Sequence, residues 1–87
     1  MFYVYLIRSK KDDRWVYTGS TGDLRKRFAM HNDGLVPSTK LYRPFHLLYY
    51  ESYAAEADAR HREQNLKLRA NAFNQLKRRL RETLKVH

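Results

Sequence analysis

The sequence predicts an α+β fold, with a small three-stranded antiparallel sheet flanked by helices in the order β-β-α-β-α-α. Two short runs rich in aromatic and β-branched residues lie near the amino terminus, and polar residues 9–13 separate them. A third apolar run lies in the middle of the chain, and beyond residue 54 the apolar period becomes helical. We treat residues 1–87 as one domain, because a typical domain has about 100–150 residues.

The first two strands are expected at residues 2–8 and 14–18, joined as an antiparallel hairpin. Successive side chains of a strand point to opposite faces of the sheet. Two sets of residues therefore share a face: Tyr3, Tyr5 and Ile7 in the first strand, and Trp15, Tyr17 and Gly19 in the second. The hairpin is thus expected to carry several tyrosines on one side.

A first helix is expected at residues 22–32, with Ser20 or Thr21 capping its free amides. Residues 35–44 form a long loop, and loops of this length in a small domain are often functional. The third strand spans residues 45–51. Its nearly continuous apolar character predicts a central position in the sheet, covered on both faces.

Two helices follow the third strand. The second helix, from residue 54 to about residue 68, rests on a helical spacing of Ala55, Ala59, Arg62 and Leu66. The chain can break at residues 69–71, where Asn71 is a possible cap. The third helix rests on a second seam, which consists of Phe73, Leu76, Leu80 and Leu84.

The composition narrows the function. Eighteen Lys and Arg against nine Asp and Glu give a net charge of +9, which indicates a polyanionic partner, either nucleic acid or an acidic membrane surface. The absence of cysteine excludes a disulfide scaffold, a cysteine nucleophile, a zinc finger and an iron–sulfur site. Since the chain has neither a signal peptide pattern nor an apolar run of about 20 residues, we expect a cytoplasmic protein with no membrane partner.

Three features could carry chemistry, and each has a plainer explanation. Arg27 and His31 lie one turn apart where the first helix meets the sheet, but Arg27 could equally cover the core edge, with His31 at the surface. Glu63 lies at the rim of its helix stripe as a candidate metal ligand, whereas position alone favours an ion pair with Lys67. The chain has seven tyrosines, and core packing accounts for tyrosines in strands.

One combination, in order along the chain, is far more specific than its members: Tyr3-Val4-Tyr5, Tyr17-Thr18-Gly19, Arg27, His31 and Glu63. It resembles the GIY-YIG nuclease domain, most closely the small standalone members of that family. The resemblance covers nearly the whole chain and implies a three-stranded antiparallel sheet flanked by helices. Tyr3 stands where the first motif has glycine, and Thr18 replaces isoleucine in the second, but the two functional tyrosines remain.

The resemblance implies a metal-dependent endonuclease that hydrolyses phosphodiester bonds in DNA. Glu63 would hold one Mg²⁺ or Mn²⁺ ion, which needs only one or two protein carboxylates. Arg27 would bind the phosphate, and Tyr17 would be the general base for the attacking water, with nearby positive charge favouring its phenolate. Tyr5 would position the water or Tyr17, and His31 could accept the proton that Tyr17 must lose.

A basic stripe on the third helix suits the phosphate backbone, although a solvated helix face is the commoner meaning of such a run. The expected nucleic-acid-binding residues are Lys40, Lys67, Asn74, Lys77, Arg78, Arg79 and Arg81. The expected partner is DNA, structured or branched, with a protein partner as a possible source of specificity. Two alternatives stay open: an inactive nucleic-acid-binding module on the same fold, and a small basic RNA- or ribosome-associated protein.

Overall fold

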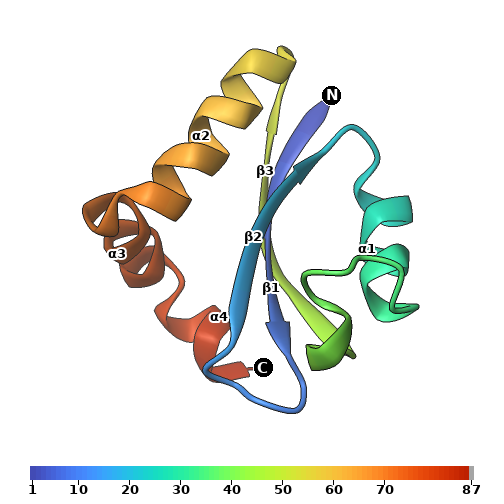
Figure 1. Cartoon of the computed structure of the whole chain (residues 1–87). Coiled ribbons are helices and arrows are strands. Elements are labelled where there is room, and N and C mark those ends of the chain that lie inside the picture. The colour runs from blue at the N-terminus through green and yellow to red at the C-terminus, as the bar shows by residue number, and fades with distance from the viewer. Residues whose placement is uncertain (87) are drawn as a thin grey trace.

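A three-stranded antiparallel sheet lies at the centre of the computed structural model, which describes residues 1–86. The strands are β1 (Phe2–Ser9), β2 (Val16–Thr21) and β3 (Phe45–Tyr53), in the spatial order β2-β1-β3. Helix α1 covers one face of the sheet, and α2, α3 and α4 cover the other (Figure 1). The predicted α+β class and the three-stranded sheet are confirmed.

The helices follow the predicted order. They are α1 (Leu24–Asn32), the single 3₁₀ turn η1 (Lys40–Tyr42), α2 (Glu56–Leu68), α3 (Ala70–Arg79) and α4 (Arg81–Val86). The order β-β-α-β-α-α is confirmed, and its last helix is divided at Leu80 into α3 and α4. Across residues 1–86, no helix combines the length and the apolar character that a membrane crossing requires.

Each face of the sheet has its own core, because side chains alternate along β1. The core against α2, α3 and α4 is aliphatic and consists of Val4, Leu6, Leu48, Ala59, Leu66, Leu76 and Leu80. The core against α1 is largely aromatic: Tyr5, Ile7 and Phe45 are buried, with Trp15, Tyr17, Leu24, Phe28 and Leu47 packed around them. The predicted sharing of faces along the hairpin and the predicted seam of the last helix are both found.

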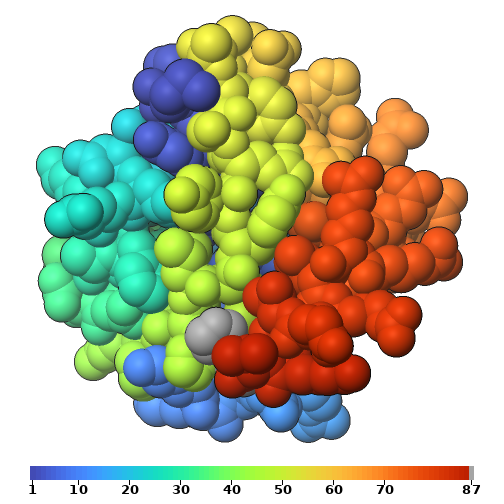
Figure 2. All heavy atoms as spheres, turned by 180° about the vertical axis from the view of Figure 1, so that it is seen from behind, coloured from blue at the N-terminus to red at the C-terminus, as the bar shows by residue number. Residues whose placement is uncertain are grey.

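The predicted central position of the third strand is wrong. β1 is the central strand and β3 is an edge strand, which lies on the surface between α1 and the red α3–α4 segment in Figure 2. A bulge explains the misleading apolar run. The register shifts between Leu6, opposite Tyr49, and Ile7, opposite Leu47. Leu47 therefore packs toward α1, whereas Leu48 and Tyr49 both pack toward α2.

The start of α1 also differs from the prediction. Asp23 is the cap, since its carboxylate accepts a hydrogen bond of 3.0 Å from the backbone N–H of Lys26, and the helix begins at Leu24. Ser20 does not cap the helix, because its hydroxyl donates to Glu63 at a distance of 2.7 Å. Because Asp23 caps α1, the hydroxyl of Ser20 in β2 is available to hold the carboxylate of Glu63 in α2.

Candidate active site

The five predicted catalytic residues belong to β1, β2, α1 and α2, and the edge strand β2 lies between α1 and α2 (Figure 1). Tyr5 and Tyr17 come from β1 and β2, Arg27 and His31 from α1, and Glu63 from α2. Their mutual proximity shows in the electrostatics, because Tyr17, Arg27 and Glu63 all act on the phenol of Tyr5. Residues that are far apart in the sequence thus form one site.

A glycine allows Tyr5 to enter this site from the neighbouring strand. Tyr5 pairs with Gly19 of β2, and its ring lies directly over that residue. A Cβ atom at position 19 would meet the Tyr5 hydroxyl and stand 2.5 Å from the ring carbon that carries it. Any side chain at this position would therefore displace the tyrosine.

The hydroxyl of Tyr5 begins a buried chain of hydrogen bonds. It lies 2.7 Å from Nε2 of His31, whose Nδ1 lies 2.8 Å from Oγ1 of Thr39. Thr39 donates its own hydrogen to the carbonyl of Val36, so Nδ1 carries the imidazole hydrogen and Nε2 accepts from Tyr5. His31 and Thr39 are both 0% exposed. No sequence pattern pointed to Thr39, which lies in the predicted loop.

Burial keeps both members of the Tyr5–His31 bond uncharged at neutral pH. It raises the pKa of Tyr5 to about 12, against the opposing effect of the Arg27 guanidinium. Burial, together with the charge of Arg27, lowers the pKa of His31 to about 4. Tyr5 is therefore a hydrogen-bond donor and a poor base. His31 was expected to accept the proton that Tyr17 loses, but its hydrogen bond in the structure is to Tyr5.

Tyr17 occupies the outer side of the same group. Its ring is half-buried, stacks beside Trp15 at a centroid distance of 6.2 Å and meets the edge of His31 at 5.4 Å. The ammonium group of Lys67 lies 5.1 Å from the centre of the Tyr17 ring. Of the two tyrosines, Tyr17 is thus the one that solvent and a cation can reach.

Both oxygens of the Glu63 carboxylate are engaged. Ser20 donates to Oε1 at 2.7 Å, and the ammonium of Lys67 pairs with Oε2 at 3.0 Å. The ion pair that position alone favoured is therefore present. It lies inside the site, however, because Lys67 also faces Tyr17.

Comparison with known proteins identifies the family. Residues 1–78 match the family model of the GIY-YIG catalytic domain. The chain belongs to the GIY-YIG family. The UPF0213 protein SSP2268 of Staphylococcus saprophyticus is 36% identical over 66 residues, which cover 75% of this chain and 78% of the relative. The UPF0213 protein YazA of Bacillus subtilis is 38% identical over 66 residues, covering 75% of this chain and 65% of YazA. No solved structure matches.

Membership of the GIY-YIG family confirms the resemblance and indicates a nuclease, which acts on nucleic acid. The structure places the predicted nucleic-acid-binding residues in different parts of the molecule. Lys67 lies in the site itself, whereas Lys40 is exposed on η1. The remaining candidates are exposed on α3 and at the start of α4, on the other side of the sheet from α1: Asn74, Lys77, Arg78, Arg79 and Arg81.

GIY-YIG nucleases generally use a divalent metal ion, and the donor set here fits one hard cation. Among residues 1–86 there is no group of three or more His, Asp or Glu side chains that could hold a metal. A single carboxylate suits Mg²⁺, which keeps several of its water ligands. Glu63 can supply that carboxylate once Lys67, a long and partly exposed side chain, leaves Oε2.

Proposed function

We propose that the chain is a metal-dependent endonuclease that hydrolyses phosphodiester bonds in DNA. The observation that carries this proposal is the grouping of one arginine, one carboxylate and one solvent-accessible phenol beside β2. Phosphodiester hydrolysis needs these elements, because charge on the phosphate must be stabilised and a water molecule must lose a proton.

Tyr17 is the general base in this mechanism. In its phenolate form it takes a proton from the attacking water as the new bond to phosphorus forms and the bond to the leaving oxygen breaks. The leaving oxygen then takes a proton from solvent. Tyr5 cannot replace Tyr17, because its hydroxyl is buried, donates to His31 and has a pKa raised to about 12.

Tyr5, His31 and Thr39 act as positioning residues. Their buried hydrogen bonds fix the inner wall of the site, against which Arg27 and Tyr17 lie. Arg27 binds the phosphate through its planar fork of N–H donors. A pre-positioned donor of this kind stabilises the charge that develops in the transition state without reorganising.

Glu63 would hold the metal ion, with Ser20 keeping the carboxylate in place through its hydroxyl. When bound, a divalent cation would neutralise charge on the phosphate and on the leaving oxygen. Lys67 pairs with Glu63, and once released from Oε2 its ammonium would be close enough to the site to meet a phosphate.

The test is a cleavage panel of duplex, single-stranded, flapped and branched DNA, with and without Mg²⁺. The wild-type chain should cut at least one substrate in Mg²⁺, and Glu63→Gln should reduce cleavage to background while DNA binding persists. Glu56→Gln is the matched control, because Glu56 is an exposed acid on the same helix that pairs with Arg60. A chain that binds every substrate but cuts none would be a binding module, and equal cleavage by Glu63→Gln would exclude Glu63 as the metal ligand.

A further inference from the structure

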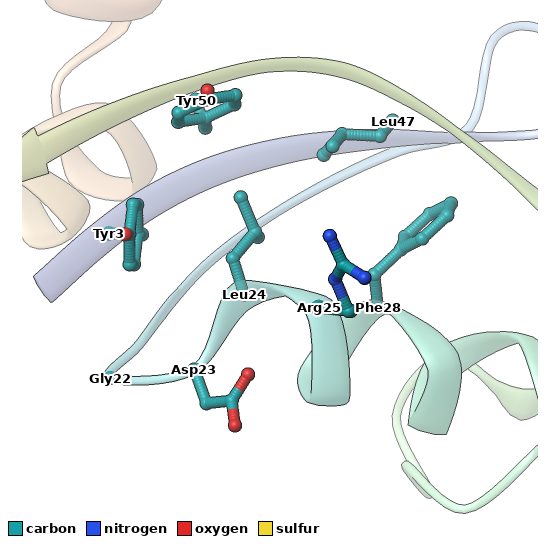
Figure 3. Close-up of a pocket in the computed structure, with 8 residues that line it drawn as sticks. All are labelled: Tyr3, Gly22, Asp23, Leu24, Arg25, Phe28, Leu47 and Tyr50. Atoms are coloured by element: carbon teal, nitrogen blue, oxygen red, sulfur yellow. The ribbon is translucent and has the colours of Figure 1, made fainter.

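A concave site lies beside α1, apart from the candidate active site. An open pocket of about 490 Å³ separates the first turns of α1 from β1 and β3 (Figure 3). Its volume is within the range of about 300–1,000 Å³ that small-molecule sites occupy. Its lining includes Tyr3, Leu24, Arg25, Phe28, Leu47 and Tyr50.

The walls of this pocket suit a flat aromatic ligand. Leu24 and Phe28 point from α1 toward the strands, and Leu47 faces them from β3 (Figure 3). Tyr3 and Tyr50 stand at one end, with ring centroids 5.9 Å apart and an interplanar angle of 67°. Tyr50 is 53% exposed, so much of its ring surface is open to a ligand. Such rings offer stacking surfaces that do not depend on the identity of the base.

The charge around the pocket selects an anionic ligand. Arg25 lines the pocket and is exposed, and the chain as a whole carries a net charge of +9. Asp23 is the acid among the lining residues, but its carboxylate is turned away from the strands (Figure 3) and accepts from the backbone of Lys26. An aromatic surface beside an exposed arginine matches a base together with its phosphate.

The pocket is close enough to the active site for one DNA strand to reach both. Tyr3 and Tyr5 are two residues apart on β1 and on the same face of the sheet. That separation is roughly 7 Å at about 3.3 Å per residue. Arg25 and Arg27 project about 200° apart around α1. The helix therefore separates the pocket, which Arg25 lines, from the active site, where Arg27 is proposed to bind the phosphate.

We infer that this pocket binds an unpaired base of single-stranded DNA, with Arg25 on an adjacent phosphate. The inference rests on the proposed function and narrows its substrate class to DNA with an unpaired segment. A base inside a duplex is stacked on both sides and paired, so it cannot place a face against Tyr50 without leaving the helix.

Binding without cleavage tests the inference. A fluorescent DNA strand of about 10 nucleotides, within the usual range for single-strand sites, is titrated with protein in EDTA. All proteins carry Glu63→Gln, so that turnover cannot occur. Tyr50→Ala should weaken binding by about tenfold or more, whereas Tyr50→Phe should bind like the parent because it keeps the ring. Arg25→Ala should weaken binding more than Lys26→Ala, a matched loss of an exposed charge on the same turn.

An abasic strand of the same length separates stacking from charge. It should bind the parent about as weakly as the normal strand binds Tyr50→Ala, and Tyr50→Ala should weaken the abasic strand no further. The inference would be overturned if Tyr50→Ala weakened the normal strand, the abasic strand and a duplex equally, or weakened none of them. Because no arm depends on cleavage, a chain that lacks nuclease activity can still support or overturn it.

Discussion

The two faces of the sheet use the same strand for different purposes. From β1, Val4 and Leu6 enter an aliphatic core against α2 and α3, while Tyr5 enters a core that also buries His31 and Thr39. The aliphatic side needs only shape and area, because dispersion and the hydrophobic effect have no direction. The side against α1 needs a partner for every buried polar atom, because an unsatisfied group costs about 1–3 kcal/mol. Tyr5 and His31 therefore lie on the side where packing is most constrained, whereas Glu63 reaches the candidate site from α2.

The two tyrosines offer the strongest test of this contrast. Tyr17→Phe keeps the ring that packs against Trp15 and removes the proposed base, so cleavage should fall by about 10²–10⁴-fold at neutral pH. Its free energy of unfolding should change by about 1 kcal/mol or less. Raised pH should restore part of the activity, because hydroxide replaces the base. Near-normal turnover at pH 7 would exclude Tyr17 from the chemistry. Steady-state rates on the best DNA substrate provide the measurement.

On the aliphatic side, the loss should be in stability alone. Leu76 is 1% exposed, and Leu76→Ala should lower the free energy of unfolding by about 2–5 kcal/mol. Activity per folded molecule should stay unchanged. Leu68→Ala is the control, since Leu68 is 81% exposed and should change stability by about 0.5 kcal/mol or less. Urea denaturation followed by Trp15 fluorescence measures both variants. A large fall in the activity of folded Leu76→Ala would show that the two sides are coupled.

Acid should destabilise the face against α1 first. His31 has a pKa of about 4 in the folded chain against an ordinary value of 6.5, so the unfolded chain binds the additional proton between these values. Stability should therefore fall as the pH drops below 6.5, with a slope that approaches about 1.4 kcal/mol per pH unit. Glu51, whose pKa is lowered by its bonds to Arg62 and two tyrosines despite burial, loses its contribution only below its ordinary pKa of 4.5.

Denaturation curves between pH 6.5 and about pH 5 separate this effect from that of Glu51, because Glu51 stays ionised there. The exposed His61 supplies the control: His61→Gln should keep the slope, and His31→Gln should flatten it. Equal stability across this range in the wild-type chain would show that His31 takes up its proton without loss of structure.

The smallest effect concerns the metal. Lys67→Met removes the ammonium from Glu63 and should raise the affinity for Mn²⁺ in the absence of DNA by about tenfold, because a positive charge near the carboxylate opposes a cation. Lys77→Met removes the same charge from α3, where Lys77 lies over Phe73, and should change little. Calorimetric titration distinguishes the two. If both variants bind the metal like the wild type, Lys67 does not compete for the carboxylate.

The alternation of side chains, the hairpin and the seam of the last helix were all predictable, because each depends on a local period of the sequence. The position of β3 was not, since a bulge at Leu48 imitates the apolar run of a buried strand. The cap of α1 was misassigned because Ser20, a good capping residue, bonds to Glu63 more than 40 residues away in the sequence.

The candidate site, like the fold, was predictable only in part. The residue types and their order indicated the family, but not which tyrosine is buried. That depends on the reach of Tyr5 across Gly19, a contact between strands with no local signature. Thr39 could not be predicted for a similar reason. Its hydroxyl bonds to His31 only when the loop is folded against α1, and no local pattern of the sequence signals that contact.

The close approach of Tyr5 to Gly19 makes the packing of the hairpin depend on the register in which β1 pairs with β2. A slip of one residue in the pairing of β1 with β2 would set Thr18 or Ser20 opposite Tyr5, and either Cβ would push the ring away. The same slip would turn Tyr17 to the aliphatic side and Ser20 away from Glu63. A misaligned hairpin would thus lose its packing and the proposed site together, so the proposed activity requires the hairpin to be paired in its native register.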